Sequence, residues 1–172
     1  PVKEEDIKYY DSTLLPKQHS TVLAIDPAYS EDDRADFKVA MVVAIDANAN
    51  RYCLDYVRTH VATGEFLDAA LNLYIKHRQT MTAFGCPNSG TEKEFYRSLV
   101  NRANERKIYP PFVELKNTFV SAETGISTRN KTKRIIAALQ PLFKQGKYFI
   151  TAEQFEFREE LLSIGYSRWD DL

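Results

Sequence analysis

The alternation of apolar and polar residues begins with a series of short, strand-like runs. Residues 21–26 form an apolar run rich in β-branched side chains and closed by Pro27, which is typical of a buried strand. Two further apolar runs, 37–46 and 51–58, are separated by a short polar turn at 47–50. Because tight turns join neighbouring antiparallel strands, this pattern predicts a three-stranded meander.

The rest of the chain alternates between helical spacing and short apolar runs. Residues 1–20 lack sustained periodicity and are predicted to be a linker or arm, and a polar loop is predicted at 117–130. Three strands followed by alternating helices and strands predict an α/β fold for residues 21–172. The layout is ribonuclease H-like, with a mixed central sheet and helices on both faces. The later predicted elements are helices at 65–77, 91–106, 131–144 and 152–163, and strands at 81–86, 112–116 and 148–150.

Length and composition describe an ordinary globular domain. The 172 residues are 44% hydrophobic and 27% charged, a balance that argues against disorder. No apolar run approaches the roughly 18 residues that span a bilayer, and the first residues lack the apolar core of a signal peptide. The two cysteines, Cys53 and Cys86, lie within apolar runs, which argues against a disulfide scaffold. We expect an intracellular protein, neither secreted nor bound to a membrane.

The charges are segregated along the chain although the net charge is only −1. Residues 1–36 carry four basic and nine acidic side chains, a balance of −5, whereas residues 106–150 carry nine basic and two acidic ones, a balance of +7. Segregation of this kind fits a polyanion-binding face beside an acidic, metal-binding one. A chance run of solvated charges is the alternative.

Carboxylates at strand and helix ends are the candidate catalytic groups. Asp26 ends the first predicted strand, where open α/β sheets place their sites, and hard cations such as Mg²⁺ prefer carboxylates. Asp170 and Asp171 form a second acidic element; turn and helix-capping roles are the alternatives for all three. A two-metal nuclease needs acids from distant parts of the chain, but Pro87 occupies the end of the fourth strand, which leaves Glu92 as a substitute one turn later. Weaker candidates beside the second strand are Asp36 and Asp46.

Basic side chains gather where the third predicted helix begins. Lys131 and Arg134 are three residues apart and therefore share a helix face. Cationic side chains at a helix start suit contacts with DNA phosphates, although a solvated helix face would explain them equally well. The candidate DNA-binding residues are Arg129, Lys131, Lys133 and Arg134.

Five short motifs, taken in order, resemble the C-terminal nuclease domain of the large terminase subunit of tailed bacteriophages. Together they extend over nearly the whole chain, and the last resembles the start of the family's C-terminal acidic motif. The motifs are DIKYYD (6–11), LAIDPAYSEDDRADFKVAMVV (23–43), KEFYRSLVNRANERKIYPPFVELK (93–116), KTKRIIAALQPLFKQGKYFI (131–150) and WDDL (169–172).

The resemblance implies a ribonuclease H-like, metal-dependent endonuclease. Such an enzyme cuts concatemeric double-stranded viral DNA at the initiation and termination of packaging, in the host cell cytoplasm during assembly. By resemblance, Asp26 is the first metal ligand and Asp170 or Asp171 the last, around Mg²⁺ or Mn²⁺, with two ions expected. Lys131 and Arg134 become DNA contacts. The implied partners are DNA, an ATPase domain preceding residues 1–20 in the full-length chain, the portal protein and the small terminase subunit.

The sequence departs from the family pattern in two places. The middle acid of the family aligns with Pro87, and the chain ends just after Asp171, within the last acidic motif. Two alternatives therefore remain. One is another ribonuclease H-like nuclease, such as a junction resolvase. The other is a catalytically weak or silent domain that grips DNA or docks on the portal.

Overall fold

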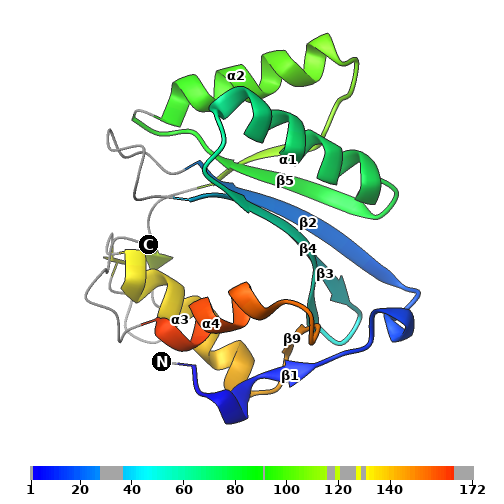
Figure 1. Ribbon diagram of the computed structural model, residues 1–172, viewed down its shortest axis with the longest axis vertical. Coiled ribbons are helices and arrows are strands. Elements are labelled where there is room, and N and C mark those ends of the chain that lie inside the picture. The colour runs from blue at the N-terminus through cyan, green and yellow to red at the C-terminus, as the bar shows by residue number, and fades with distance from the viewer. Residues whose placement is uncertain are drawn as a thin grey trace. The chain divides into compact units, whose positions relative to one another are not determined.

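The computed structural model describes residues 2–27, 37–90, 92–115, 119–120, 127–128 and 131–164, with only the backbone at 119–120, 127–128 and 131–132 (Figure 1). The strands are β1 (Lys8–Tyr9), β2 (His19–Asp26), β3 (Lys38–Asp46), β4 (Arg51–Thr59), β5 (Met81–Pro87), β6 (Phe112–Leu115), β7 (Phe119–Val120), β8 (Ser127–Thr128) and β9 (Tyr148–Ile150). The α-helices are α1 (Thr63–His77), α2 (Glu92–Glu105), α3 (Lys131–Lys144) and α4 (Phe155–Ser163), and short 3-10 helices lie at Glu4–Asp6 and Ser12–Leu14.

A mixed sheet of seven strands confirms the predicted α/β architecture. The strand order is β1-β9-β4-β3-β2-β5-β6. Parallel pairing joins β2 to β5, β5 to β6 and β9 to both β4 and β1. The neighbours β3 and β4 are connected by the predicted tight turn, which the Asp46 amide closes by donating to the Asn50 carbonyl over 3.1 Å. The predicted polar loop at 117–130 contains the small antiparallel pair β7 and β8.

The chain divides into two compact units, the larger of which holds residues 19–44 and 54–116. In this unit α1 and α2 lie side by side against β2 and β5 (Figure 1). Their apolar stripes meet the inward side chains of the strands in one core. Its largest fully buried side chains include Leu23, Phe66, Leu71, Phe84 and Leu99.

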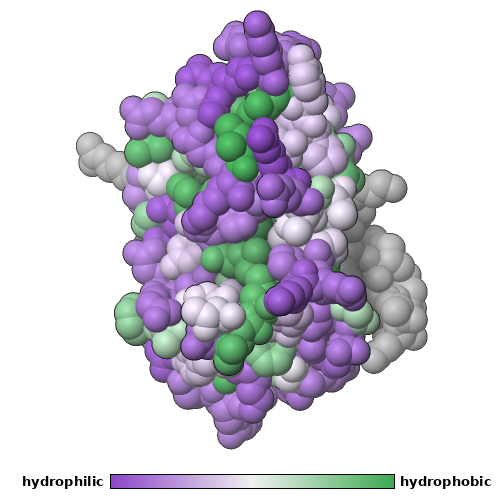
Figure 2. Space-filling model, turned by 90° about the vertical axis from the view of Figure 1, so that its right-hand side faces the viewer, coloured by the Kyte–Doolittle hydropathy of each residue, from purple (hydrophilic) through white to green (hydrophobic). Residues whose placement is uncertain are grey.

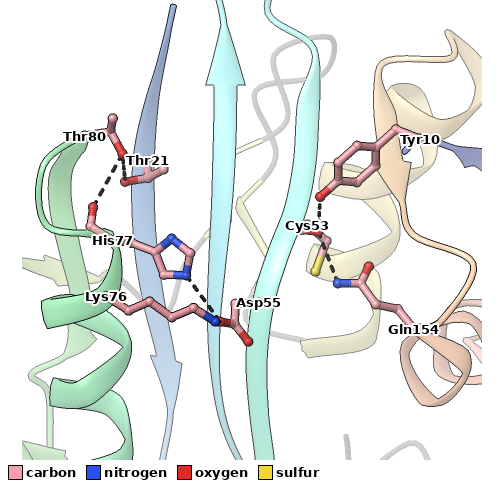
Figure 3. Close-up of polar contacts among 8 residues, drawn as sticks. All are labelled: Tyr10, Thr21, Cys53, Asp55, Lys76, His77, Thr80 and Gln154. Atoms are coloured by element: carbon pink, nitrogen blue, oxygen red, sulfur yellow. Dashed lines mark hydrogen bonds and ion pairs between the residues drawn. The ribbon is translucent and has the colours of Figure 1, made fainter. Parts of the chain in front are cut away.

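An ion-paired carboxylate ties β4 to the C-terminal end of α1 (Figure 3). Asp55 accepts hydrogen bonds from Lys76 Nζ over 2.6 Å and from His77 Nε2 over 3.2 Å. Burial acts to raise the pKa of Asp55, but the hydrogen bonds from Lys76 and His77 outweigh it and hold that pKa below its ordinary value. The charged form of Asp55 therefore stabilises the folded state.

Replacing Asp55 with asparagine is expected to lower the free energy of unfolding by about 1–2 kcal/mol at neutral pH. Because the pKa of Asp55 is depressed on folding, its contribution is present above the unfolded-state pKa of about 3.9 and disappears as the pH falls through the folded-state value. Urea denaturation of wild type and Asp55→Asn at about pH 7 and about pH 3 measures this change. A stability difference that is as large in acid as at neutral pH would contradict the electrostatic origin.

The N-terminal segment belongs to the other unit, which holds residues 1–18, 45–53 and 117–172. Here the structure corrects one expectation, since the segment predicted as an arm supplies the edge strand β1. Lys8 pairs with Phe149 and Tyr9 with Ile150, from a strand near the other end of the chain. The pairing partner is so distant in sequence that local periodicity carries no trace of it.

Side chains from both ends of this unit meet at one backbone carbonyl (Figure 3). The Cys53 carbonyl accepts a hydrogen bond from the Tyr10 hydroxyl over 2.8 Å and another from Gln154 Nε2 over 3.1 Å. Gly146 ends α3 with a φ of +63°, as the sequence predicts for a helix-terminating glycine. These contacts join β1, β4 and the approach to α4 into one folded unit.

Hydrophilic side chains dominate the face drawn in Figure 2, where hydrophobic ones form narrow groups between them. Within the described residues, no helix has both the length and the apolar character needed to cross a membrane.

Candidate metal and DNA site

Asp26 lies at the carboxyl end of β2, beside the parallel strand β5. The register pairs Ala24 with Gly85, so its continuation by two residues sets Asp26 opposite Pro87. In the next strand, Pro87 pairs with Leu115. The carboxyl ends of three parallel neighbours therefore meet at this edge, the position at which α/β sheets bind ligands.

The residues aligned with Asp26 on the two neighbouring strands, Pro87 and Leu115, are apolar. Leu115 packs against the backbone of Gly85 so closely that a Cβ atom placed there would lie 2.8 Å from the Leu115 Cδ2 atom. A larger residue at position 85 would require the Leu115 side chain to move. Pro87 is buried, so the strand ends adjacent to Asp26 carry no carboxylate on this row. The structure thus sets Pro87 where the sequence comparison with the nuclease family expected an acid.

Strand alternation assigns Asp26 to the sheet face opposite α1 and α2. Leu23 and Ile25 point into the core beneath these helices, and successive strand residues point to opposite faces. Asp26 therefore shares with Ala24 the face that α1 and α2 do not cover, which is called the uncovered face below. A carboxylate placed in this way can reach a ligand without passing through the hydrophobic core.

Glu92 begins α2 and lies on the helix side. Its carboxylate accepts a hydrogen bond from the Ser89 hydroxyl over 3.0 Å. Burial, with a smaller effect from the negative charge of Glu92, raises the pKa of the core thiol Cys86 to about 12. Glu92 thus belongs to α2, on the helix-covered side of the sheet, whereas Asp26 belongs to the opposite face.

The Asp46 side chain stabilises the turn between β3 and β4 through hydrogen bonds. Its carboxylate accepts hydrogen bonds from the amides of Asn48 and Asn50, each over 2.9 Å, and from the Tyr52 hydroxyl over 3.0 Å. Burial acts to raise the pKa of Asp46, but these hydrogen bonds outweigh it and lower the pKa. Asp46 therefore has a structural role, and the other weak candidate, Asp36, lies outside the described residues.

The candidate DNA-binding residues lie at the start of α3. Lys131 is its first residue, Lys133 is exposed and Arg134 is half-buried. Among the described residues, Arg134 Nε is buried without a hydrogen-bond acceptor. Arg129, Asp170 and Asp171 lie outside the part of the chain that the structure describes.

The metal site expected from the sequence stays a prediction. No group of three or more His, Cys, Asp or Glu side chains in this part of the chain is arranged to hold a metal ion. Asp26 has the donor chemistry for Mg²⁺ or Mn²⁺, which are commonly held by one or two carboxylates together with water and substrate phosphates.

A cationic cluster near the same end of the sheet was missed by sequence reasoning. The guanidinium carbon of Arg58, near the end of β4, lies 3.3 Å from the centroid of the Phe37 ring. The His60 ring centroid is 3.7 Å from the same ring. The three residues are called the Phe37 cluster below, and Phe37 is far in sequence from the other two. The only sequence signal is that Arg58 and His60, with one residue between them, lie at the end of a predicted strand.

Comparison with known proteins finds no matching protein family and no curated relative. Solved structures, however, include similar domains. The nuclease of the large terminase from thermophilic phage G20c with bound zinc has a TM-score of 0.54 at 11% identity, covering 95% of this chain and 77% of that one. The human cytomegalovirus terminase nuclease domain has a TM-score of 0.56 at 8% identity, covering 89% and 76%. The fold is that of a terminase nuclease domain.

This domain has the ribonuclease H-like fold that the motifs predicted. It also matches the large terminase of the thermophilic bacteriophage D6E with a TM-score of 0.57 at 9% identity, over 87% of this chain. The chain spans about a third of the length of that protein, because the match covers 33% of it. The likeness concerns the fold of one domain.

Proposed function

We propose that this domain is the metal-dependent endonuclease of a viral DNA-packaging terminase, cutting concatemeric double-stranded DNA when packaging starts and ends. The observation that carries the proposal is the position of Asp26. It ends a central strand beside the carboxyl ends of two parallel neighbours, within a fold otherwise seen in terminase nucleases. A hydrolytic site at this edge would use Asp26 as its first ligand.

The proposed reaction depends on metal ions and on the carboxylates that hold them. Mg²⁺ or Mn²⁺, with two ions expected, would supply an activated water for attack on the phosphodiester and charge stabilisation at the leaving oxygen. Asp26 holds its carboxylate toward the uncovered face, and Asp170 or Asp171 is proposed as the second ligand. The G20c nuclease with bound zinc supports a divalent metal in a domain of this fold.

DNA contacts and partners complete the proposal. Lys133 and Arg134, together with Arg129 and Lys131, would bind backbone phosphates near the start of α3. The ATPase domain of a longer chain, the portal protein and the small terminase subunit are the proposed partners, acting in the host cell cytoplasm during assembly.

A catalytically weak or silent domain is the second candidate function. The observation in its favour is the apolar row of Pro87 and Leu115 beside Asp26, where a middle acid would be needed for tight binding of a second ion. Such a domain would grip DNA or dock on the portal without cutting. A junction resolvase would instead prefer branched over linear DNA.

Metal removal distinguishes these functions. Supercoiled plasmid incubated with the protein and Mn²⁺ or Mg²⁺ is expected to become nicked and then linear, whereas EDTA abolishes both products because the attacking water loses its activation. Gel electrophoresis over time measures the products. Salt-sensitive DNA binding without cleavage in either metal would reject the nuclease and favour the silent domain. Faster cutting of a four-way junction than of a linear duplex would favour a resolvase.

A further inference from the structure

The Phe37 cluster lies at the end of the sheet that carries Asp26. Phe37 immediately precedes β3, and Arg58 is the penultimate residue of β4. Since β3 and β4 are joined by a tight turn at their other ends, the start of β3 lies beside the end of β4. The end of β2 lies beside the start of β3, because these sheet neighbours run in opposite directions (Figure 3). Asp26 and the cluster therefore border the same edge.

The cluster also shares the sheet face of Asp26. Ala40 and Val42 of β3 point into the core beneath α1 and α2. Successive strand residues point to opposite faces, so Phe37, three positions before Ala40, lies with Val39 on the other face. In β4, Asp55 contacts α1, which assigns Arg58, three residues later, to the uncovered face. The ring contact between Arg58 and Phe37 agrees with this assignment.

The spacing suits two neighbouring contacts on one nucleic-acid strand. The order β4-β3-β2 leaves two strand spacings of about 4.8 Å between Arg58 and Asp26, a lateral separation of about 10 Å. A separation of this size lies within the reach of neighbouring phosphates on one DNA strand, which follow each other every 3.4 Å of helix rise and wind around the axis. An arginine side chain can shorten the distance further.

The aromatic contact holds the cation in place before DNA arrives. A guanidinium stacked on an aromatic face loses less conformational freedom on binding than a free side chain, and its planar donors match phosphate oxygens. Arg58 is half-buried, whereas the side chain of Arg97 on α2 is 69% exposed. The Arg58 side chain thus has the preorganisation of a binding group.

We propose that Arg58, positioned by the Phe37 ring, binds a backbone phosphate close to the one at the Asp26 site. The ligand class is the phosphodiester backbone of DNA, independent of base sequence. The location relative to the cut rests on the proposed function, but the phosphate contact itself is measured by binding alone. Arg58 is the binding residue, and Phe37 is a positioning residue.

The test is DNA binding without turnover. Fluorescence anisotropy of a short labelled duplex, titrated with the protein in EDTA at several salt concentrations, gives the affinity and its salt dependence. Arg58→Ala is expected to bind about tenfold more weakly at low salt and to reduce the slope of log affinity against log salt by about one. Phe37→Leu is expected to weaken binding, whereas Phe37→Tyr keeps the aromatic platform and should restore it.

The matched control is Arg97→Ala, which removes an exposed arginine from the same unit. Thermal denaturation of every variant identifies loss of folding, and Arg58→Lys, which keeps the positive charge, is expected to retain most of the salt slope. Unchanged affinity and slope in Arg58→Ala would overturn this inference while leaving the nuclease proposal standing. An equal loss in Arg97→Ala would overturn it too, because the effect would then be common to arginines. Loss of slope in Arg58→Ala, with a wild type that never cuts, would reject the nuclease and retain the phosphate contact.

Discussion

Asp26→Asn is expected to reduce plasmid cleavage in Mn²⁺ or Mg²⁺ by at least about 100-fold, equivalent to about 2.7 kcal/mol of lost transition-state stabilisation. Asparagine keeps the size of the side chain but removes the negative charge that a divalent cation requires. Asp26 ends β2 on the uncovered face, outside the hydrophobic core, so the fold should survive the change. Initial rates of nicking and the thermal midpoint, measured on the same preparations, separate these effects.

Substitutions of two glutamates on α2 supply a control and a second test for this experiment. Glu94→Gln is the matched control, because Glu94 is exposed and forms a local ion pair with Arg97 over 3.1 Å. Glu92→Gln asks whether this residue replaces the absent middle acid. Since Glu92 lies toward the helix-covered face, we expect its cleavage rate to stay within about threefold of wild type, less than 1 kcal/mol. Full activity in Asp26→Asn would contradict the proposed site, and a large loss in Glu92→Gln would establish the substitute ligand.

Phe84→Ala is expected to lower the free energy of unfolding by about 3–5 kcal/mol. Phe84 is 0% exposed in β5, and its ring lies 5.1 Å from that of Phe112 and 6.4 Å from that of Tyr74, between centroids. Removing it leaves a cavity beneath α1 that the surrounding rings cannot fill without leaving their own contacts. Urea denaturation followed by circular dichroism measures the change.

Val113→Ala is the control for this substitution. Val113 is 45% exposed in β6, so shortening it should cost less than about 1 kcal/mol. A comparable loss of stability in both variants would show that the edge strand β6 and the core beneath α1 contribute equally. A loss below about 1 kcal/mol in Phe84→Ala would contradict the central place of its ring in the core.

Local patterns predicted most of the secondary structure because amphipathic spacing directly reflects which side of an element is buried. The helix predicted at 131–144 begins and ends as observed, and the one predicted at 65–77 begins two residues earlier, at Thr63. The edge strand β1 escaped this reasoning. It is two residues long and gains its hydrogen bonds from β9, so its identity depends on a partner that local sequence does not specify.

For the candidate site, the sequence by itself determined the strand-end position of Asp26, the proline where an acid was expected, and the basic start of α3. These are properties of residue type and local spacing. Only the tertiary structure decided which groups meet. It set Pro87 and Leu115 in a row beside Asp26, set Glu92 toward the other face, and stacked Arg58 on Phe37. The physical reason is that register and strand order bring together residues whose separation along the chain carries no information about their distance in space.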